Sequence, residues 1–467
     1  MAPKSPLRTK LLFQSPLPFK LPSVSQLLAL LLSAGAYAGL AYATPRAQFG
    51  QLAGLMALAL AAYAWLLRTQ LPLRWGLGAA LLFRLLWLPA QTALSDDVYR
   101  FRWDGLLVAH GVNPFRFRPD ELIADGARTA LPEAATRAVV LPELQRLYHR
   151  LNSPHYYSVY PPISQAVFGA GARLFPTSQR GFVMSLRVAV LLAEGGTAWL
   201  LLALLPAFGW PTGRALRYLL HPLVIVELIG NLHFEALAIC FVLLAIWLLH
   251  RRRWALSAGA LGLGAAAKLL PLLALPLLVR RLGWRRFVAY SAGVAGTLLL
   301  LFAPFISVAL VVNISRSLTL YFRSFEFNAS IYYVLRAIGY HLTTYNEIAR
   351  IGPALALLAG LFGLGLAWRE RHPTLASLPL ALMLLFTGYY ALATTVHPWY
   401  ITPLIALAPL TRFRYPLVWG GAAVLSYAAY STSAYTENLW LVGLEYAVVG
   451  AVLVWELRWK RGVRSGE

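Results

Sequence analysis

Cysteine and charge are both scarce in this chain. The single cysteine, Cys240, lies inside an apolar run, so no intramolecular disulfide can form and no cysteine-based metal site exists. Charged residues make up only 13% of the 467 residues, whereas a soluble protein carries about 25%. Composition therefore excludes a soluble enzyme, a fibrous protein and a disordered protein.

Long hydrophobic runs are what the chain has in abundance. Apolar stretches recur from Leu21 to Leu457, and a stretch of about 20 residues is long enough to cross a bilayer as a helix. The first stretch has no small-residue cleavage motif, so we expect it to remain as a membrane anchor. The sequence predicts an all-α polytopic membrane protein. Its expected membrane helices lie near residues 22–43, 50–67, 75–94, 181–205, 215–230, 232–249, 287–306, 352–368, 374–394, 398–411, 413–431 and 437–457.

The distribution of lysine and arginine predicts the orientation. Basic residues gather on the cytoplasmic side of membrane helices. With the N-terminus inside, the inner segments hold 23 of the 41 Lys and Arg residues and hardly any acids. The segment 95–180 carries ten Arg and eight Asp or Glu, so it is nearly neutral and is expected outside. The net charge of +23 is therefore mostly a topology signal, and nucleic acid is not an expected partner.

The parity of the crossings settles two ambiguous runs. The run 254–279 has basic clusters at both ends, so we expect a hairpin of two short helices with Lys268 and Pro271 at its tip. The stretch 161–175 must not cross, or every later loop would invert, so we expect a helix on the outer face. Together these readings predict about 12–14 membrane segments. The expected organisation is a cytoplasmic tail (1–21), N-terminal membrane helices (22–94), an outer catalytic loop with juxtamembrane helices (95–180), central membrane helices (181–306), a second outer loop (307–351), C-terminal membrane helices (352–457) and a cytoplasmic tail (458–467).

The most informative motif begins just past the third expected helix. It reads Ser95-Asp-Asp-Val-Tyr-Arg-Phe-Arg-Trp-Asp-Gly105 and runs on to Gly-Val-Asn-Pro-Phe. A carboxylate of Asp96 or Asp97 at the outer membrane surface could act as a general base that takes the proton from a sugar hydroxyl. Adjacent residues on a helix point about 100° apart, so we expect only one of the two to face the site. The alternative interpretation is a helix cap or a surface pair of acids.

Two further clusters combine aromatic and polar side chains. Tyr160 and Gln165 belong to the segment Ser-Val-Tyr-Pro-Pro-Ile-Ser-Gln, whose tyrosines suit sugar stacking and equally suit an interfacial aromatic belt. His233 and Glu235 lie at the outer end of a helix pair, where ionisable groups need a cavity or a partner. A helix–helix hydrogen bond is the alternative role for that pair.

Lys268 is the most unusual cation, because it lies in the middle of an apolar run. Inserting a lysine there costs about 2.5–3.5 kcal/mol, and Pro271 breaks the helix and frees backbone N–H groups. A lipid phosphate would satisfy both the charge and the N–H groups. The alternative is that the side chain snorkels to the outer surface.

All of these clusters map to one side of the membrane, together with an aromatic segment at 321–333 and a lone His397. A structural role is the alternative interpretation of His397. The location of all these clusters on one side of the membrane, however, favours a single outer-face site. The candidate substrate-binding residues are Tyr99, Arg100, Trp103, Asp104, Asn113, Tyr160, Gln165, His233, Glu235, Glu326, Asn328 and His397.

Together the motifs resemble the GT-C glycosyltransferases, most closely the bacterial polyprenol-phosphate-mannose-dependent mannosyltransferases. The resemblance rests on SDDVYRFRWDG, GVNPF, SVYPPISQ, GNLHFEAL, AAKLLP, FEFNASIYY and HPWY, in this order between about Ser95 and Tyr400. It implies a GT-C-like bundle and a catalytic acid at the start of the first large outer loop, a role that Asp96 fits first and Asp97 second. Here the loop follows the third helix, whereas in many family members it follows the first.

The resemblance also implies substrates and partners. A hexose, expected to be mannose, would move with inversion from a polyprenyl-phosphate donor to a hydroxyl on a lipid-linked or cell-envelope glycan. Charge developing on the leaving phosphate needs cations, for which Lys268, Arg102 and Arg323 are the candidates. The expected location is the bacterial inner membrane, with the active site on the periplasmic side. No cofactor is assigned, and a divalent metal stays open because adjacent acids differ from the acid-x-acid pattern of metal-dependent members.

Two other functions stay as alternatives. A lipid or sugar transporter or flippase would also need buried charges and broken helices, but paired repeats and midplane sites typical of transporters are not evident. An O-antigen-type polymerase or ligase would need a lipid-pyrophosphate donor instead of a monophosphate donor.

Overall fold

The computed structural model describes residues 20–464 except 93, 127–129, 132 and 433–434. The basic residues expected in the N-terminal tail before position 20 lie outside the described residues. Over the described part the chain is helical, and its only β feature is an isolated bridge between Phe327 and Thr395. The prediction of an all-α polytopic membrane protein is confirmed.

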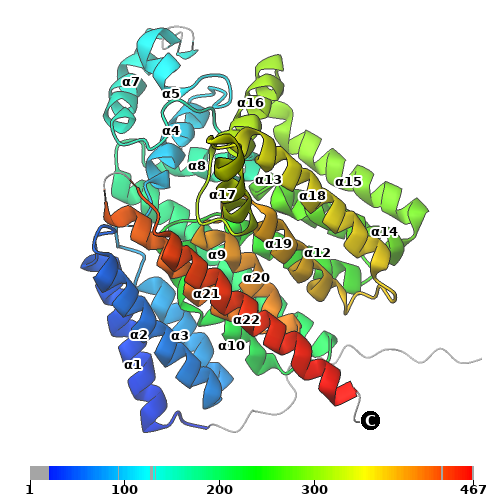
Figure 1. The fold of residues 1–467 in the computed structure, drawn as a ribbon. Helices are drawn as coiled ribbons and strands as arrows, with labels where there is room; N and C mark the ends of the chain where they lie inside the picture. The colour runs from blue at the N-terminus through cyan, green and yellow to red at the C-terminus, as the bar shows by residue number, and fades with distance from the viewer. Residues whose placement is uncertain (1–19, 93, 127–129, 132, 433–434, 465–467) are drawn as a thin grey trace, which may run out of the picture.

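The N-terminal part consists of α1 (Val24–Tyr42), α2 (Phe49–Arg68) and α3 (Leu73–Leu85), which lie together at one side of the molecule (Figure 1). Ser23 and Gln26 form a capping box at the start of α1, which satisfies backbone N–H groups that a helix leaves open. The third helix is shorter than the predicted 75–94 because it ends before Pro89, whose ring cannot continue a helix.

The segment after α3 folds into short helices. They are α4 (Asp97–Ala109), α5 (Pro119–Glu121), a π-helical turn (Leu122–Gly126), α7 (Ala134–Tyr148) and α8 (Pro162–Leu174). Figure 1 shows α5 and α7 at one end of the molecule, with α4 and α8 beneath them. Pro161 caps α8 and Pro162 occupies its first turn, where proline is tolerated. A helix therefore occupies the range 161–175 as expected, and its place at the membrane surface stays a prediction.

The central part contains a sharp bend. After α9 (Gln179–Ala207), a 3-10 turn (Thr212–Ala215), α10 (Leu216–Leu219) and α11 (Pro222–Val224), a π-helical segment (Ile225–Gly230) meets α12 (Glu235–His250) at 114°. Next come α13 (Trp254–Ala267), a 3-10 segment (Leu270–Ala274), α14 (Leu275–Leu282) and α15 (Trp284–Phe302), which runs on into a 3-10 turn (Ala303–Phe305). The range 254–279 thus holds two helical segments with a break at Lys268, while the side of the membrane on which they begin stays a prediction.

The C-terminal part closes the bundle. Its helices are α16 (Val308–Ser324), α17 (Ile331–Thr343), α18 (Ile348–Arg369), α19 (Leu378–Leu392), a 3-10 turn (Pro398–Ile401), α20 (Thr402–Leu407), a 3-10 turn (Ala408–Leu410), α21 (Tyr415–Ala422), a 3-10 segment (Ala423–Ser431) and α22 (Leu439–Arg464). The long α22 runs across α21, beside the N-terminal helices (Figure 1).

The helices differ in whether they can span a membrane. Six described helices are long and apolar enough, and the bent pair around residue 231 would make a seventh. They are α1, α2, α9, α15 with its terminal turn, α18 and the apolar part of α22. The remaining segments of the predicted 12–14 fall on shorter or broken helices, among them α13 and α19, and their crossing of the membrane stays a prediction.

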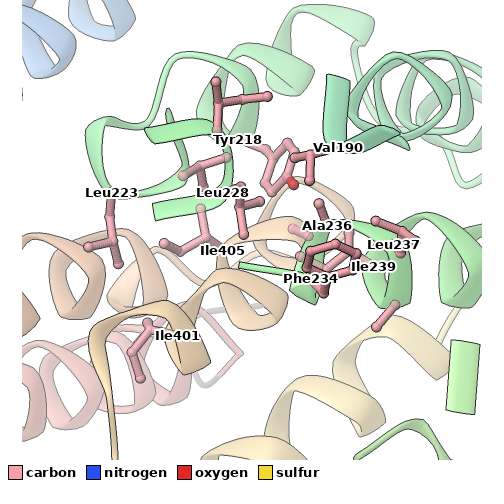
Figure 2. Close-up of a cluster of buried hydrophobic side chains, with 14 of the residues drawn as sticks. Val190, Tyr218, Leu223, Leu228, Phe234, Ala236, Leu237, Ile239, Ile401 and Ile405 are labelled. Atoms are coloured by element: carbon pink, nitrogen blue, oxygen red, sulfur yellow. The ribbon is translucent and has the colours of Figure 1, made fainter. Parts of the chain in front are cut away.

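A buried cluster fills the centre, where α9 to α12 meet α20. Figure 2 shows residues of these elements packed around the bend, among them Tyr218, Leu228, Phe234 and Ile405, all at most 2% exposed. This packing holds the bend in place, and the bend brings the start of α12 next to the start of α4.

Candidate active site

A cavity of about 290 Å³, called the polar cavity below, is lined by residues from widely separated parts of the chain, from Arg46 to Tyr435. Several of these side chains reach it because a helix starts or stops beside them. The cavity is lined by six of the predicted site residues, namely Asp96, Asp97, Tyr160, His233, Lys268 and His397.

Local sequence explains how each of these segments ends. Asp96 is the N-cap of α4, and Tyr160 lies just before the two prolines that start α8. Lys268 has extended backbone (φ −151°, ψ 135°) directly after α13, and His397 is followed by Pro398, which opens a 3-10 turn. Because helix interiors are interrupted here, these side chains face a common space instead of a lipid-facing helix surface.

The acidic end of the cavity is held by two polar partners. The carboxylate of Asp96 forms an ion pair with Arg46 at 2.6 Å, and Asp97 accepts a hydrogen bond of 3.0 Å from the Asn152 amide. The Asp96 side chain is 33% exposed, so water and a substrate hydroxyl can reach it. Sequence reasoning missed Arg46, although an arginine in a loop expected outside departs from the positive-inside pattern.

The basic end is formed by Lys268. Its ammonium group lies 2.8 Å from Glu235 Oε1 and 5.6 Å from the centre of the Tyr400 ring, a cation–π distance. Lys268 also borders a second cavity of about 240 Å³, which is mostly apolar. That apolar groove is lined among others by Glu235, Leu269, Leu270, Phe322, Phe386, Tyr389 and Leu407.

Three stacked rings, those of His233, Trp399 and His397, line the polar cavity, and Phe327 extends the stack. Phe327 stacks on His397 at 4.8 Å, His397 on Trp399 at 4.3 Å, and Trp399 on His233 at 3.8 Å. Burial lowers the pKa of His397 to about 3, and positive charge on His233 and Lys268 acts in the same direction. His397 is therefore neutral near pH 7. Trp399 and Tyr400 were part of the predicted HPWY motif but were not singled out as site residues.

Residues 21–283, which are more than half of the chain, match the family described as Alpha-(1->6)-mannopyranosyltransferase, N-terminal domain (MptA_B_family). The chain belongs to this family. It is therefore a GT-C mannosyltransferase, as the resemblance predicted. The match includes the cavity residues from Arg46 to Lys268, whereas His397 lies beyond it. No curated protein matches the chain.

Three predicted binding residues of this mannosyltransferase lie together outside the cavity. Asp104 is fully buried and pairs with Arg100 at 2.9 Å, while its other oxygen accepts hydrogen bonds from Ser158 and Gln165. Arg100 also donates to the backbone carbonyl of Tyr156. These contacts join α4, α8 and the chain before α8, so this network supports the cavity wall and none of its members lines the cavity.

The other predicted residues of α4 and its following loop point elsewhere. Arg102 is buried, donates to the Pro176 carbonyl at 2.9 Å and lies 3.7 Å from Glu143, so it is no cation of the cavity. Trp103 is buried. Tyr99 borders a different hollow together with Arg150, and Asn113 donates to the Phe305 carbonyl.

Three candidates near α16 are also separate from the cavity. Arg323 borders a surface hollow along α16. Glu326 pairs with Arg336 and accepts from Tyr332. The Asn328 amide donates to Glu445 at 3.1 Å. Glu326 and Asn328 thus serve contacts between helices, which a sequence motif does not distinguish from substrate contacts.

Among the described residues, no three His, Cys, Asp or Glu side chains converge on a point that could hold a metal ion. Asp96 and Asp97 are each engaged by a nitrogen donor instead.

Proposed function

We propose that this mannosyltransferase transfers mannose from a polyprenyl-phosphate donor to a hydroxyl of a lipid-linked or cell-envelope glycan, at the periplasmic face of a bacterial inner membrane. The observation that carries this proposal is the position of Lys268, which borders both the polar cavity and the apolar groove. A lipid-linked sugar phosphate needs such a junction, because its chain is apolar, its phosphate is anionic and its sugar is polar.

In this proposal the donor lies across the junction. The first isoprene units occupy the apolar groove between Leu270 and Phe386, where burial of apolar surface stabilises them. The phosphate contacts Lys268, and the sugar extends towards Asp96 and Asp97. Tyr160 lines the cavity and provides a surface against which a sugar can pack.

The chemistry is a single displacement. The acceptor oxygen attacks the anomeric carbon, the bond from that carbon to the phosphate oxygen breaks, and the acceptor proton passes to Asp96 or Asp97. Lys268 stabilises the charge that develops on the leaving phosphate. Attack from the face opposite the phosphate inverts the anomeric centre, so a β-linked donor gives an α-linked product.

The test is mannose transfer by purified protein in lipid, with polyprenyl-phosphate mannose as donor. Asp96→Asn and Asp97→Asn are each expected to lower kcat, with at least 100-fold loss in the variant that lacks the base. Asp120→Asn is the matched control, because Asp120 is an outer-segment acid that hydrogen-bonds His155 and does not line the cavity. Full activity of both Asp96→Asn and Asp97→Asn would rule out the base assignment.

The donor class is tested separately. Lys268→Ala is expected to raise the donor KM more than it lowers kcat, because its charge meets the phosphate. Supplying polyprenyl-phosphate mannose, polyprenyl-phosphate glucose and a polyprenyl-pyrophosphate sugar in separate reactions identifies the donor. Transfer from the pyrophosphate donor alone would replace this proposal by a polymerase- or ligase-type reaction.

A further inference from the structure

Glu227 is a buried carboxylate that the proposed chemistry does not use. It lies in the π-helical segment before the 114° bend and is fully buried. Its Oε1 accepts hydrogen bonds from the Tyr427 hydroxyl and from the Asn231 amide at 3.2 Å. A carboxylate within membrane-spanning structure is costly unless a partner satisfies it, so its second oxygen needs an explanation.

The second oxygen, Oε2, faces His233. Glu227 Oε2 and His233 Nε2 lie 3.3 Å apart, and over the described part of the chain neither atom has another hydrogen-bond partner. Leaving either atom unsatisfied in a dry interior costs about 1–3 kcal/mol. A hydrogen bond from the His233 Nε2–H to Glu227 Oε2 would satisfy both atoms at once, which makes the two side chains one unit.

The backbone fixes this unit in place. The His233 N–H donates to the Glu227 carbonyl at 3.2 Å, and Leu232 between the π-segment and His233 has a φ of 63°. A leucine rarely adopts this left-handed conformation and keeps it only where the surroundings enforce it. Backbone strain of this kind is concentrated at functional sites. Here the strained backbone directs the His233 side chain into the cavity.

The remaining surroundings of His233 favour a positive charge that points at an anion. Its ring lies flat on Trp399, with 3.8 Å between the ring centres and 11° between the planes, and an aromatic face attracts a cation. The ring lines the polar cavity together with Lys268, beside the opening to the apolar groove. The other charged or titratable groups on this cavity are Arg46, Asp96, Asp97, His397, Tyr160, Tyr321, Tyr400, Tyr430 and Tyr435. Glu235 offsets the charge of Lys268.

We propose that Glu227 is a positioning residue that holds His233 as an imidazolium aimed at the donor phosphate. His233 donates its Nε2–H to Glu227 and its Nδ1–H to a phosphate oxygen, so it acts as a second cation beside Lys268. The inference rests on the proposed donor site. It assigns a role to a carboxylate that never touches substrate.

The experiment compares inhibition of mannose transfer by polyprenyl phosphate and by the uncharged polyprenol. The ratio of the two inhibition constants measures the phosphate contact alone. Glu227→Gln and His233→Asn are each expected to weaken inhibition by polyprenyl phosphate about tenfold, the size of one charge-assisted hydrogen bond, with inhibition by polyprenol unchanged. In the double variant, Glu227→Gln is expected to add nothing, because Glu227 acts only through His233.

Glu445→Gln is the matched control. Glu445 is also a fully buried carboxylate that accepts from an aromatic N–H, that of Trp419 at 2.9 Å, and from the amide of Asn328. It does not line the cavity, so the ratio is expected to stay at the wild-type value. If Glu227→Gln does not fold, Glu227→Asp keeps the charge but retracts it, and an intermediate ratio is expected.

The outcomes separate this inference from the proposed function. A wild-type protein that does not distinguish polyprenyl phosphate from polyprenol overturns the donor site itself. A wild-type preference for the phosphate that persists in Glu227→Gln or Glu227→Asp, or losses that add in the double variant, overturn only the Glu227–His233 assignment. A fall in kcat with unchanged inhibition by polyprenyl phosphate would make His233 a proton acceptor instead.

Discussion

At the scale of single residues, Arg187 of α9 does the most to hold the site together. It is fully buried, and its guanidinium donates to the carbonyls of Leu88 and Ala90 before α4 and of Ile229 and Gly230 at the bend. These two chain segments lead to Asp96 and to His233. One planar cation with five donors can serve four carbonyls at once, which lysine cannot.

Arg187→Met is therefore expected to destabilise the protein by about 3 kcal/mol or more, since several buried acceptors lose their donor. The stability of the Arg187→Lys protein is expected to lie between that of the methionine variant and that of the wild type. The measurement is the apparent unfolding temperature in detergent together with transfer activity. Arg180→Met, an exposed change on the same helix, is the control and is expected to leave both unchanged. An Arg187→Met protein as stable as the control would contradict the role.

At the scale of elements, the contact between α4 and α8 positions both acids relative to Tyr160. Gly105 makes this contact possible, because a Cβ there would lie 2.5 Å from the Phe168 backbone carbonyl oxygen. Gly105→Ala must push the two helices apart and is expected to cost about 1–3 kcal/mol and to lower kcat. Gly195→Ala on α9 is the control, because its Cβ meets nothing within 4 Å and alanine favours a helix. The measurements are the unfolding temperature and kcat of both variants. Equal values for Gly105→Ala and Gly195→Ala would contradict the prediction.

The elements also explain how far the sequence could predict the site. Tyr160, Lys268 and His397 each lie within three residues before a proline, and proline ends or starts a helix. Polar residues at such breaks are exposed to a shared space, and these three line the cavity. Arg100, Arg102 and Asp104 lie inside a helix instead. Which face of α4 is covered depends on α7 and α8, and no local pattern in α4 reveals it.

At the scale of the whole molecule, the helical class follows from composition, but the lengths of individual helices do not. The run 75–94 is mostly apolar, yet α3 ends at Leu85, and the following turn packs inside the protein with Trp87 fully buried. Apolar character marks burial in protein and in lipid alike. Orientation, in contrast, depends on charge in the loops and can be tested directly.

The last prediction concerns that orientation. Replacing Cys240 with Ala removes the chain's single cysteine and allows one new cysteine to be placed at a time. Val139→Cys on α7, 63% exposed, is expected to react with a membrane-impermeant thiol reagent in intact spheroplasts. His372→Cys, exposed in the loop between α18 and α19, is expected to react only after the membrane is opened, because the neighbouring arginines favour the cytoplasmic side. The Cys240→Ala protein is the unlabelled control. The reverse pattern would place the polar cavity on the cytoplasmic side and remove the proposed periplasmic reaction.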